Sequence, residues 1–317
     1  MYISTYFATV LAAASTAQAL QSSDGTTAAS FSKRGLVSKL VGGFIGFKTQ
    51  DTTVCPDVWS EISETLTQQF LADGQCTDAA RAAIRAPFHD CFNGACDGSL
   101  ILADECSRRE NTGLTRLCGN LGNLAKEKNV GVADLIQFAG AHAIKTCPGG
   151  PTVPVLIGRP DSAVASPAGI LPSGNAVASD LIQHFAARGF SAVDLAALIG
   201  AHTAARNRIA VPAKANLTLD STPGQWDSKY YSETIAGRAP VTLPSDKSLA
   251  DHPVTGVAMR GFAVSQGAWS LAFVPAMAKM SMLGVEKGGL VDCTSALPGG
   301  SRKRDVRRSS VFERLGW

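Results

Sequence analysis

Hydrophobic positions recur at helical spacing along most of the chain. In residues 57–72, large apolar side chains follow one another every four positions and the run stops at Gly74, which predicts a helix with one buried face. Strand candidates are few and short, such as 154–157. The pattern therefore predicts a mainly α fold. Further helices are expected over 132–146, 179–188, 228–236, 245–250 and 254–283.

Turn and cap residues refine this pattern. Thr77 and Asp78 are expected to cap a helix in which Pro87 should produce a kink or an end. Ser191 and Asp194 resemble a capping box that opens a helix running to about residue 205. Pro275 is expected to bend the long helix near the C-terminus. Residues 99–131 and 207–228 are expected to be mostly irregular.

Length and charge narrow the class of protein. A chain of 317 residues, 45% hydrophobic and 17% charged, suits one large globular domain or two coupled lobes. The net charge of +3 resides in the ends of the chain, because residues 35–301 carry a net charge of −2. This slightly acidic body gives no reason to expect nucleic acid as a partner.

The N-terminus resembles a secretory signal. An apolar run over 6–14 leads to Ala17-Gln18-Ala19, a typical cleavage site, and the run is too short to span a membrane. We expect a signal peptide over 1–19, a propeptide over 20–34 ending at Lys33-Arg34, a folded domain over 35–295 and a flexible basic tail over 296–317. Alternatively, residues 20–34 stay attached as a disordered arm. The protein is expected to be secreted, with no membrane segment.

The eight cysteines indicate four disulfides, because an even number of cysteines in a secreted chain usually pairs completely. None has the spacing of a zinc finger. The residues alone favour only the local pairs, Cys91–Cys96 and Cys106–Cys118.

The segment 81–98 carries the densest chemistry. Arg85, Phe88 and His89 lie at i, i+3 and i+4, so a cation, an aromatic ring and an imidazole share one helix face. This pairing suits a neutral imidazole base beside a guanidinium that meets developing negative charge. The alternative is an ordinary amphipathic helix with one histidine near its end.

Two further histidines occur in an internal echo, DLIQFAGAHA at 134–143 and DLAALIGAHT at 194–203. His202 lies on an apolar stripe, where a lone histidine is usually a core residue. Asp246, in LPSDKSLAD, has the setting of a carboxylate that holds a ligand imidazole by its second nitrogen. Two oxygen-rich sets suit calcium, although each alone could be a plain turn: Asp90, Asp97 and Ser99, and Asp220, Thr222 and Asp227.

Taken together, these motifs resemble those of the secreted fungal haem peroxidases (class II) of the plant peroxidase superfamily, collinearly from Cys55 to Cys293. The distal motif is Arg85-x-x-Phe88-His89-Asp90, and the proximal motif is Gly200-Ala201-His202-Thr203. The other matching segments are 108–114, 156–161, Leu171-Pro172, 220–227 and Ser245-Asp246.

The resemblance implies two helical lobes, stapled by disulfides, that sandwich a haem b. His202 would bind the iron and Asp246 would accept its other N–H. His89 would be the distal base, Arg85 the charge stabiliser, and Asn111 the partner of His89, with Glu105 supporting that link. The resemblance also implies Phe88 and Pro172 beside the haem, a distal calcium at Asp90, Asp97 and Ser99, a proximal calcium at Thr203, Asp220, Thr222 and Asp227, and the disulfides Cys76–Cys147 and Cys55–Cys293.

Departures from the family's pattern bear on the substrate. Lignin-oxidising members carry a surface tryptophan where this chain has Ala197. Manganese-oxidising members carry three acidic residues at positions where this chain has Asp78, Ala82 and Arg208, of which only Asp78 is acidic. Cys91 and Cys96 are more similar to the plant secretory enzymes. We therefore expect a generic peroxidase that uses hydrogen peroxide to oxidise small phenolic or dye-like donors. Trp59, Trp226 and Tyr230 are alternative radical sites, each more typical of a core residue, and His142 is expected to be structural.

Two other classes of function compete with this interpretation. One is a haem-binding relative with little turnover, which the complete set of catalytic residues disfavours. The other is a secreted metal-dependent hydrolase, but the chain has no H-E-x-x-H pair and no nucleophile elbow. We also expect a monomer. The sequon Asn216-Leu217-Thr218 predicts a glycan on a secreted chain, the alternative being that it stays unmodified.

Overall fold

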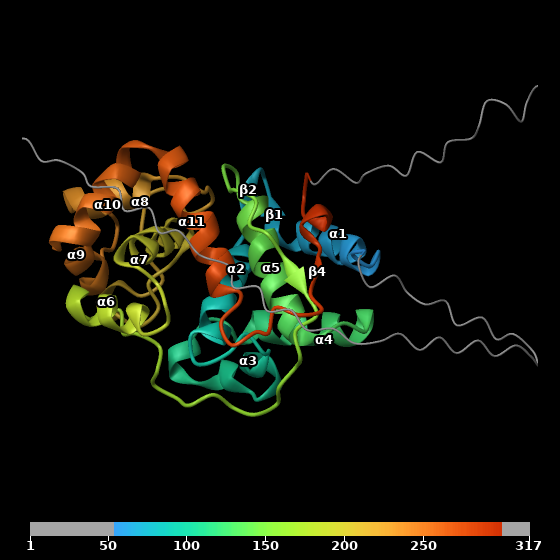
Figure 1. Ribbon diagram of the computed structural model, residues 1–317. Helices are drawn as coiled ribbons and strands as arrows, with labels where there is room; N and C mark the ends of the chain where they lie inside the picture. The colour runs from blue at the N-terminus through green and yellow to red at the C-terminus, as the bar shows by residue number, and fades with distance from the viewer. Residues whose placement is uncertain (1–53, 300–317) are drawn as a thin grey trace, which may run out of the picture. The chain divides into compact units, whose positions relative to one another are not determined.

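The part of the chain that the computed structural model describes, residues 54–299, contains eleven α-helices, five short 3₁₀ segments and two small two-stranded sheets (Figure 1). The mainly α prediction is confirmed. Strand β1 pairs with β2, and β3 pairs with β4, both antiparallel. The helices are α1 (Val58–Phe70), α2 (Asp78–Cys91), α3 (Ser99–Leu102), α4 (Thr115–Lys128), α5 (Val132–Thr146), α6 (Ala178–Ala186), α7 (Ala192–Leu198), α8 (Lys229–Ala236), α9 (Pro244–Asp251), α10 (Pro253–Val264) and α11 (Gln266–Met280). The strands are β1 (Leu71–Ala72), β2 (Gln75–Cys76), β3 (Leu156–Ile157) and β4 (Val291–Asp292).

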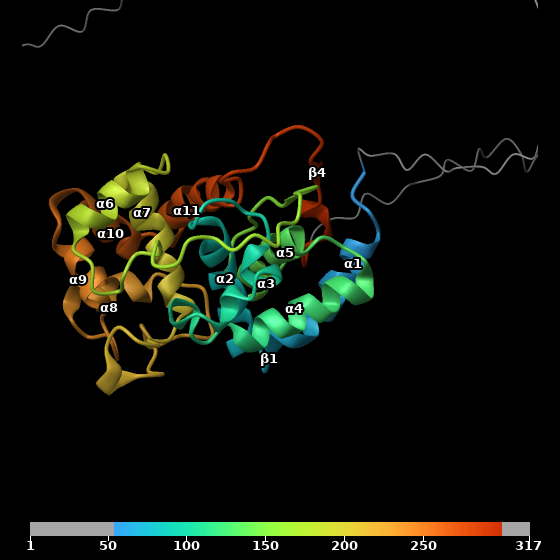
Figure 2. The ribbon, with the colours of Figure 1, turned by 90° about the horizontal axis from the view of Figure 1, so that it is seen from below.

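The helices form two groups that share one hydrophobic core. In the first group α2 packs along α5, with α1 and α4 beside them. In the second, α7 packs between α10 and α11, and α8 and α9 lie against α10 (Figures 1 and 2). Helix α11 also contacts α2, and the buried core runs from Trp59 of α1 to Met280 of α11.

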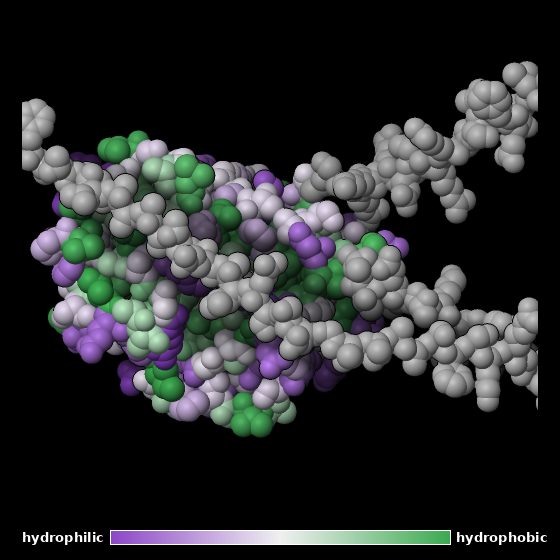
Figure 3. Space-filling model, viewed as in Figure 1, coloured by the Kyte–Doolittle hydropathy of each residue, from purple (hydrophilic) through white to green (hydrophobic). Residues whose placement is uncertain are grey.

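Polar and apolar side chains are interspersed on the face shown in Figure 3. None of the helices described between residues 54 and 299 combines the length and the hydrophobicity of a membrane span.

Helix α2 continues through Pro87 to Cys91, so of the two predicted effects of that proline, a kink or an end, the end is wrong. Thr77 caps the helix as expected, with its hydroxyl accepting the Ala80 N–H at 3.2 Å. The Pro87 ring fits because α5 presents Gly140 to it. A Cβ on Gly140 would lie 2.3 Å from the Pro87 Cγ. The glycine thus allows the close approach of the two central helices of the first group.

Two other predictions need correction. Residues 99–131 are not mostly irregular, because Thr115–Lys128 form α4, whose buried side chains include Leu117, Leu121 and Leu124. The predicted helix over 254–283 is two helices that separate at Ser265, whose backbone is extended and whose hydroxyl caps α11. Pro275 stays inside α11. The carbonyl that it leaves without a helical donor belongs to Leu271, which is 81% exposed and so can be hydrated.

Four disulfides join the described residues, and they are the expected pairs: Cys55–Cys293, Cys76–Cys147, Cys91–Cys96 and Cys106–Cys118. Cys55–Cys293 ties the start of the described body to its end. Leu297 is only 3% exposed, so the packed body extends two residues beyond the predicted boundary at 295. The predicted signal peptide and propeptide, and residues 300–317 of the predicted tail, lie outside the described residues.

Two helical glycines give a matched test of this packing. We expect Gly140→Ala to lower the free energy of unfolding by about 1–3 kcal/mol, because its Cβ would overlap the Pro87 ring. Gly119→Ala, in α4, has no atom within 4 Å of the new Cβ and should instead raise the free energy of unfolding by about 0.4–1 kcal/mol. Chemical denaturation of both variants measures the difference. Equal effects would show that the α2–α5 contact is looser than described.

Candidate active site

A cavity of about 630 Å³ lies between the two helical groups, and both groups supply its walls. His89 and Arg85 reach it from α2, and His202 from the 3₁₀ segment Ile199–Ala204 that follows α7. Apolar side chains, including Phe88, line much of the remainder. The volume lies within the usual range for a small-molecule site.

His89 is fully engaged on both sides of its ring. Its Nδ1 lies 2.6 Å from the Asn111 Oδ1, and its Nε2 accepts the Arg85 Nε–H at 2.6 Å. The Asn111 amide nitrogen donates to the Glu105 carbonyl at 2.7 Å, so the amide oxygen faces the ring. This network assigns the His89 proton to Nδ1 and leaves Nε2 as a lone-pair acceptor.

Burial is the largest cause that lowers the pKa of His89 well below 6.5, and the nearby Arg85 charge lowers it further, while the Asn111 hydrogen bond opposes both. The imidazole is therefore neutral at neutral pH and can take up a proton. Arg85 is itself held by the carbonyls of Glu110 and Thr112, each at 2.9 Å. Burial, followed by the charge of Arg208, lowers the pKa of Arg85 to about 10, so it stays a cation.

Glu105 supports the Asn111–His89 link through its backbone carbonyl rather than its carboxylate. Glu105 is 1% exposed, and its carboxylate makes separate contacts. It accepts the Ser166 N–H at 2.6 Å and forms an ion pair with Arg108 at 3.1 Å. These contacts fix the segment that carries Asn111, which is itself fully buried.

His202 has one nitrogen held and one free. Its Nδ1 lies 3.0 Å from the Asp246 Oδ2, and Asp246 is fully buried at the start of α9. Its Nε2 has no hydrogen-bond partner among residues 54–299, and 28% of the side chain is exposed. The Tyr230 ring meets the imidazole edge-on, with centroids 5.7 Å apart.

The backbone at Gly200, two residues before His202, is packed tightly. A Cβ on Gly200 would lie 2.2 Å from the Tyr231 hydroxyl and 2.6 Å from the Trp269 ring. Both side chains also donate to carbonyls at the end of α7, Tyr231 to Ala196 at 2.8 Å and Trp269 to Ala197 at 2.9 Å. Gly200 therefore lets two large rings brace the turn that carries His202.

The second oxygen-rich set converges as expected. The Thr203 hydroxyl donates to Asp220 at 2.6 Å, and the Thr222 hydroxyl donates to Asp227 at 2.9 Å. Burial, opposed by the two hydrogen bonds and reinforced by the Asp227 and Glu233 charges, raises the pKa of Asp220 to about 6. The buried carboxylate of Asp220 and the half-buried carboxylate of Asp227, with two hydroxyls, are a donor set that a hard cation would stabilise.

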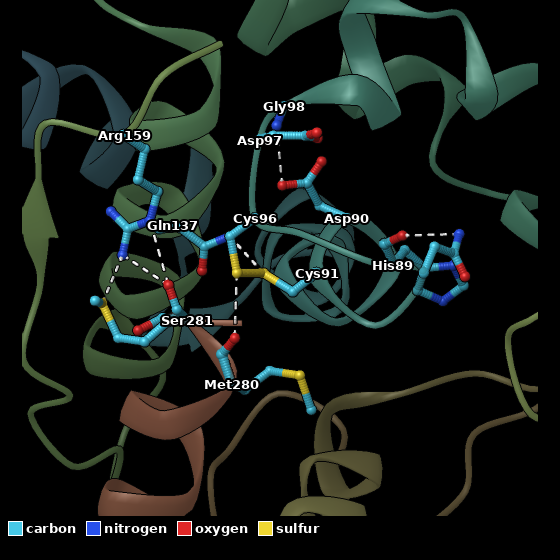
Figure 4. Close-up of a disulfide and its surroundings, with 12 residues drawn as sticks. His89, Asp90, Cys91, Cys96, Asp97, Gly98, Gln137, Arg159, Met280 and Ser281 are labelled. Atoms are coloured by element: carbon cyan, nitrogen blue, oxygen red, sulfur yellow. Dashed lines mark hydrogen bonds between the residues drawn. A yellow bond between two sulfur atoms is a disulfide. The ribbon is translucent and has the colours of Figure 1, made fainter. Parts of the chain in front are cut away.

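Asp90 and Asp97 of the first set lie on one side of the Cys91–Cys96 disulfide (Figure 4). Asp90 is 1% exposed and accepts the N–H groups of Gly98 and Leu100 at 3.2 and 3.3 Å. Burial, together with the Asp97 and Glu105 charges, raises its pKa to about 7. Within residues 54–299, no three His, Cys, Asp or Glu side chains cluster as metal ligands, so either set would need hydroxyl or carbonyl oxygens as well.

The remaining predicted residues are distributed as follows. Pro172 lines the cavity, and Asn216 is exposed. His142 is fully buried, with its ring nitrogens near the Ser63 carbonyl and the Thr67 and Thr146 hydroxyls, contacts that suit a structural role. Trp59, Trp226 and Tyr230 are core residues. Four further arginines line the cavity beside Arg85, of which the sequence pointed only to Arg208: Arg81, Arg109, Arg206 and Arg208.

Comparison with known proteins adds independent information. A family model described as peroxidase matches residues 58–265. The low-redox potential peroxidase of Taiwanofungus camphoratus is 32% identical over 262 residues, covering 76% of this chain and 78% of that protein. Manganese peroxidase 3 of Phlebia radiata is 28% identical over 286 residues, covering 80% and 79%. A peroxidase of Coprinopsis cinerea is also 28% identical, covering 80% and 78%.

Proposed function

The chain belongs to the peroxidase family, and we propose that it is a haem peroxidase that uses hydrogen peroxide to oxidise small phenolic or dye-like donors in one-electron steps. The observation that carries this proposal is the pairing of two histidines in one cavity. His89 is neutral and has Nε2 as a base, and the Nε2 of His202 has no partner within the described range 54–299. His89 and Arg85 supply a base and a cation from α2. His202 would supply an electron-rich ligand from the 3₁₀ segment that follows α7.

The residues around the cavity fit a haem. Its walls are largely apolar, which suits the porphyrin faces, and Arg206 and Arg208 offer cations for the propionates. His202 would hold the iron through Nε2, while Asp246 accepts the Nδ1 proton and makes the imidazole a stronger donor. Phe88 and Pro172 would pack beside the ring. When bound, the haem supplies the two electrons that reduce peroxide and later regains them singly from donors.

His89 would move the proton. Its Nε2 takes a proton from one oxygen of hydrogen peroxide and delivers it to the other, which leaves as water. Arg85 already donates to this nitrogen, so its guanidinium must turn toward the peroxide before the transfer. The carbonyls of Glu110 and Thr112 keep it close, where it stabilises negative charge on the departing oxygen. Asn111 holds the Nδ1 proton and so maintains the reactive tautomer.

The absence of an acidic set supports a phenol-oxidising rather than a manganese-oxidising enzyme. Asp78 pairs with Arg81 at 2.9 Å and with Arg206 at 3.0 Å, and positions 82 and 208 are Ala and Arg. The position of the ligninolytic tryptophan holds Ala197, which is fully buried. The haem-loaded protein should oxidise guaiacol with hydrogen peroxide, and added Mn²⁺ should give no Mn³⁺–malonate complex. Mn³⁺ formation without phenol oxidation would overturn this assignment.

Two calcium ions would complete the protein, one at Asp90, Asp97 and Ser99, and one at Thr203, Asp220, Thr222 and Asp227. Calcium would relieve the repulsion between the carboxylates of each pair. Four disulfides support folding in an oxidising compartment, and therefore secretion. The exposed Asn216 supports glycosylation of its sequon.

Chelation tests the calcium sites. Removing calcium with EGTA should lower the melting temperature by about 5–10 °C, because a ligand at a hundredfold excess over its Kd contributes about 2.7 kcal/mol. The Asp220→Asn variant should lose most of the part of this melting-temperature difference that calcium at the proximal site contributes. Differential scanning calorimetry with and without calcium measures it. A melting temperature that EGTA leaves unchanged in the wild-type protein would contradict both sites.

A further inference from the structure

A long connection without helix or strand, residues 158–177, joins β3 to α6 (Figure 1). We call it the crossing segment. Its residues 171–175 line the cavity, so the segment forms part of the wall that a reducing donor would meet. Most side chains in the preceding stretch, 161–170, are exposed and add little packing to hold it. Whatever fixes the backbone of the crossing segment therefore helps to set the shape of the cavity.

Two carboxylates anchor the middle of the crossing segment. Among the described residues, the backbone of 163–172 makes no hydrogen bond to another backbone group. Two of its N–H groups bond instead to side chains of a different part of the chain. Ser166 donates to the Glu105 Oε1 at 2.6 Å, and Gly169 donates to the Glu110 Oε2 at 2.9 Å. The position of this stretch thus depends on the two glutamates.

Glu110 also contacts the catalytic machinery, through its main chain. Its carbonyl accepts the Arg85 Nη2–H at 2.9 Å, one of the contacts that hold the guanidinium near His89. Of the described residues that line the cavity, Glu110 is the one acidic residue. Its backbone therefore holds the cation that meets developing charge, while its side chain holds the wall that meets the donor.

The surroundings of the Glu110 carboxylate leave the Gly169 N–H as its hydrogen-bond partner. The other oxygen, Oε1, is buried and has no hydrogen-bond partner among residues 54–299. Arg108 lies between the two glutamates, with its Nη1 3.1 Å from the Glu105 Oε2 and 3.9 Å from the Glu110 Oε1. The Glu110 side chain is only 22% exposed. A carboxylate in such a setting accepts an N–H more strongly than a neutral acceptor does, so this single contact can hold the backbone.

We propose that Glu110 is a positioning residue that fixes the crossing segment against the segment that holds Arg85, and thereby shapes the donor site. The proposal rests on the proposed function and adds a residue to its donor site. Without the carboxylate, the stretch 163–172 would lose one of its two anchors, and the cavity wall at 171–175 would become less ordered. Arg85 would keep its place, because replacing the Glu110 side chain leaves the carbonyl that binds it. Donor binding should therefore weaken more than the later chemistry.

Hydrogen exchange followed by mass spectrometry tests the contact without turnover. In the haem-loaded protein, Glu110→Ala should speed exchange of the Gly169 amide about tenfold, because this N–H loses a charged acceptor. Glu110→Gln keeps a side-chain oxygen that accepts the N–H and should retain most of the protection. Peptides from α2 and α5 should exchange alike in all three proteins, which excludes a general loss of stability.

Steady-state kinetics test the consequence for the donor. With guaiacol as donor, Glu110→Ala in the holoenzyme should raise KM about three- to tenfold, while kcat changes less than about twofold. Glu110→Gln should recover most of the wild-type KM. Glu127→Ala is the matched control, because Glu127 is a 71% exposed carboxylate of α4 outside the cavity. It should alter neither the exchange of the Gly169 amide nor KM.

The outcomes separate the two proposals. Equal exchange of the Gly169 amide in wild type and Glu110→Ala would overturn the anchor. Faster exchange with an unchanged KM, or an equal loss in kcat that Glu110→Gln does not restore, would overturn the role in the donor site. Failure of the wild-type holoenzyme to oxidise guaiacol would instead count against the proposed function. In that case the exchange rates still decide whether Glu110 holds the crossing segment.

Discussion

Replacing His89 by alanine is expected to slow the reaction of the haem-loaded protein with hydrogen peroxide by about 10²–10⁴-fold. The variant loses the base that accepts the peroxide proton at Nε2, and with it the group that returns the proton to the leaving oxygen. His202 and Asp246 are untouched, so haem content should stay the same. Stopped-flow measurement of the second-order rate constant gives the effect.

His184→Ala is the matched control for this variant. His184 lies in α6 outside the cavity, where its ring packs edge-on against Phe92. It should alter stability slightly and leave the peroxide rate within a factor of about two, since it touches no reacting group. A His89→Ala enzyme that reacts with peroxide as fast as wild type would refute the role assigned to His89.

Arg85→Gln should lower the same rate constant by about 10²–10³-fold, the usual cost of removing a donor aimed at developing negative charge. The change should also move the pH profile. Arg85 lowers the pKa of His89, so its removal raises that pKa. Because only the neutral imidazole is a base, the acid limb of the profile should shift to higher pH.

The pH shift distinguishes this role from a structural one. A variant that had only distorted α2 would lose rate at every pH without moving the limb. Arg81→Gln is the comparison, since Arg81 lies one turn earlier on α2 and bonds to Asp78 and to backbone carbonyls instead of His89. A limb at unchanged or lower pH in Arg85→Gln would contradict the proposed coupling.

The helices with a clear apolar period and a recognisable cap could be predicted from the sequence. Thr77 and the Ser191–Asp194 capping box, for example, begin helices where expected. Helix α4 was missed because Gly119 and Gly122 weaken its local propensity, although Leu117, Leu121 and Leu124 carry the period. The break at Ser265, inside what was predicted as one helix with a bend at Pro275, depends on tertiary packing, which local propensity does not contain.

The site was predictable only in part from spacing. Arg85 and His89 are four residues apart on one helix, so their contact follows from helical geometry. Asn111 and Asp246 lie 22 and 44 residues from the histidines they contact. The local setting of Asp246 suggested a carboxylate that holds an imidazole, but only the family resemblance indicated which histidine each residue contacts. The convergence of Arg208 with Gly113 joins two loops without regular structure, and neither spacing nor resemblance indicated it.

An absorption spectrum recorded before and after one equivalent of hydrogen peroxide tests the central claim most directly. The protein, expressed with adequate haem, should show a Soret band that shifts on peroxide addition and returns when a phenol is supplied. A Soret band that ignores peroxide would mean a haem-binding relative without turnover. No Soret band at all would contradict the assignment of His202 as a haem ligand and the peroxidase function built on it.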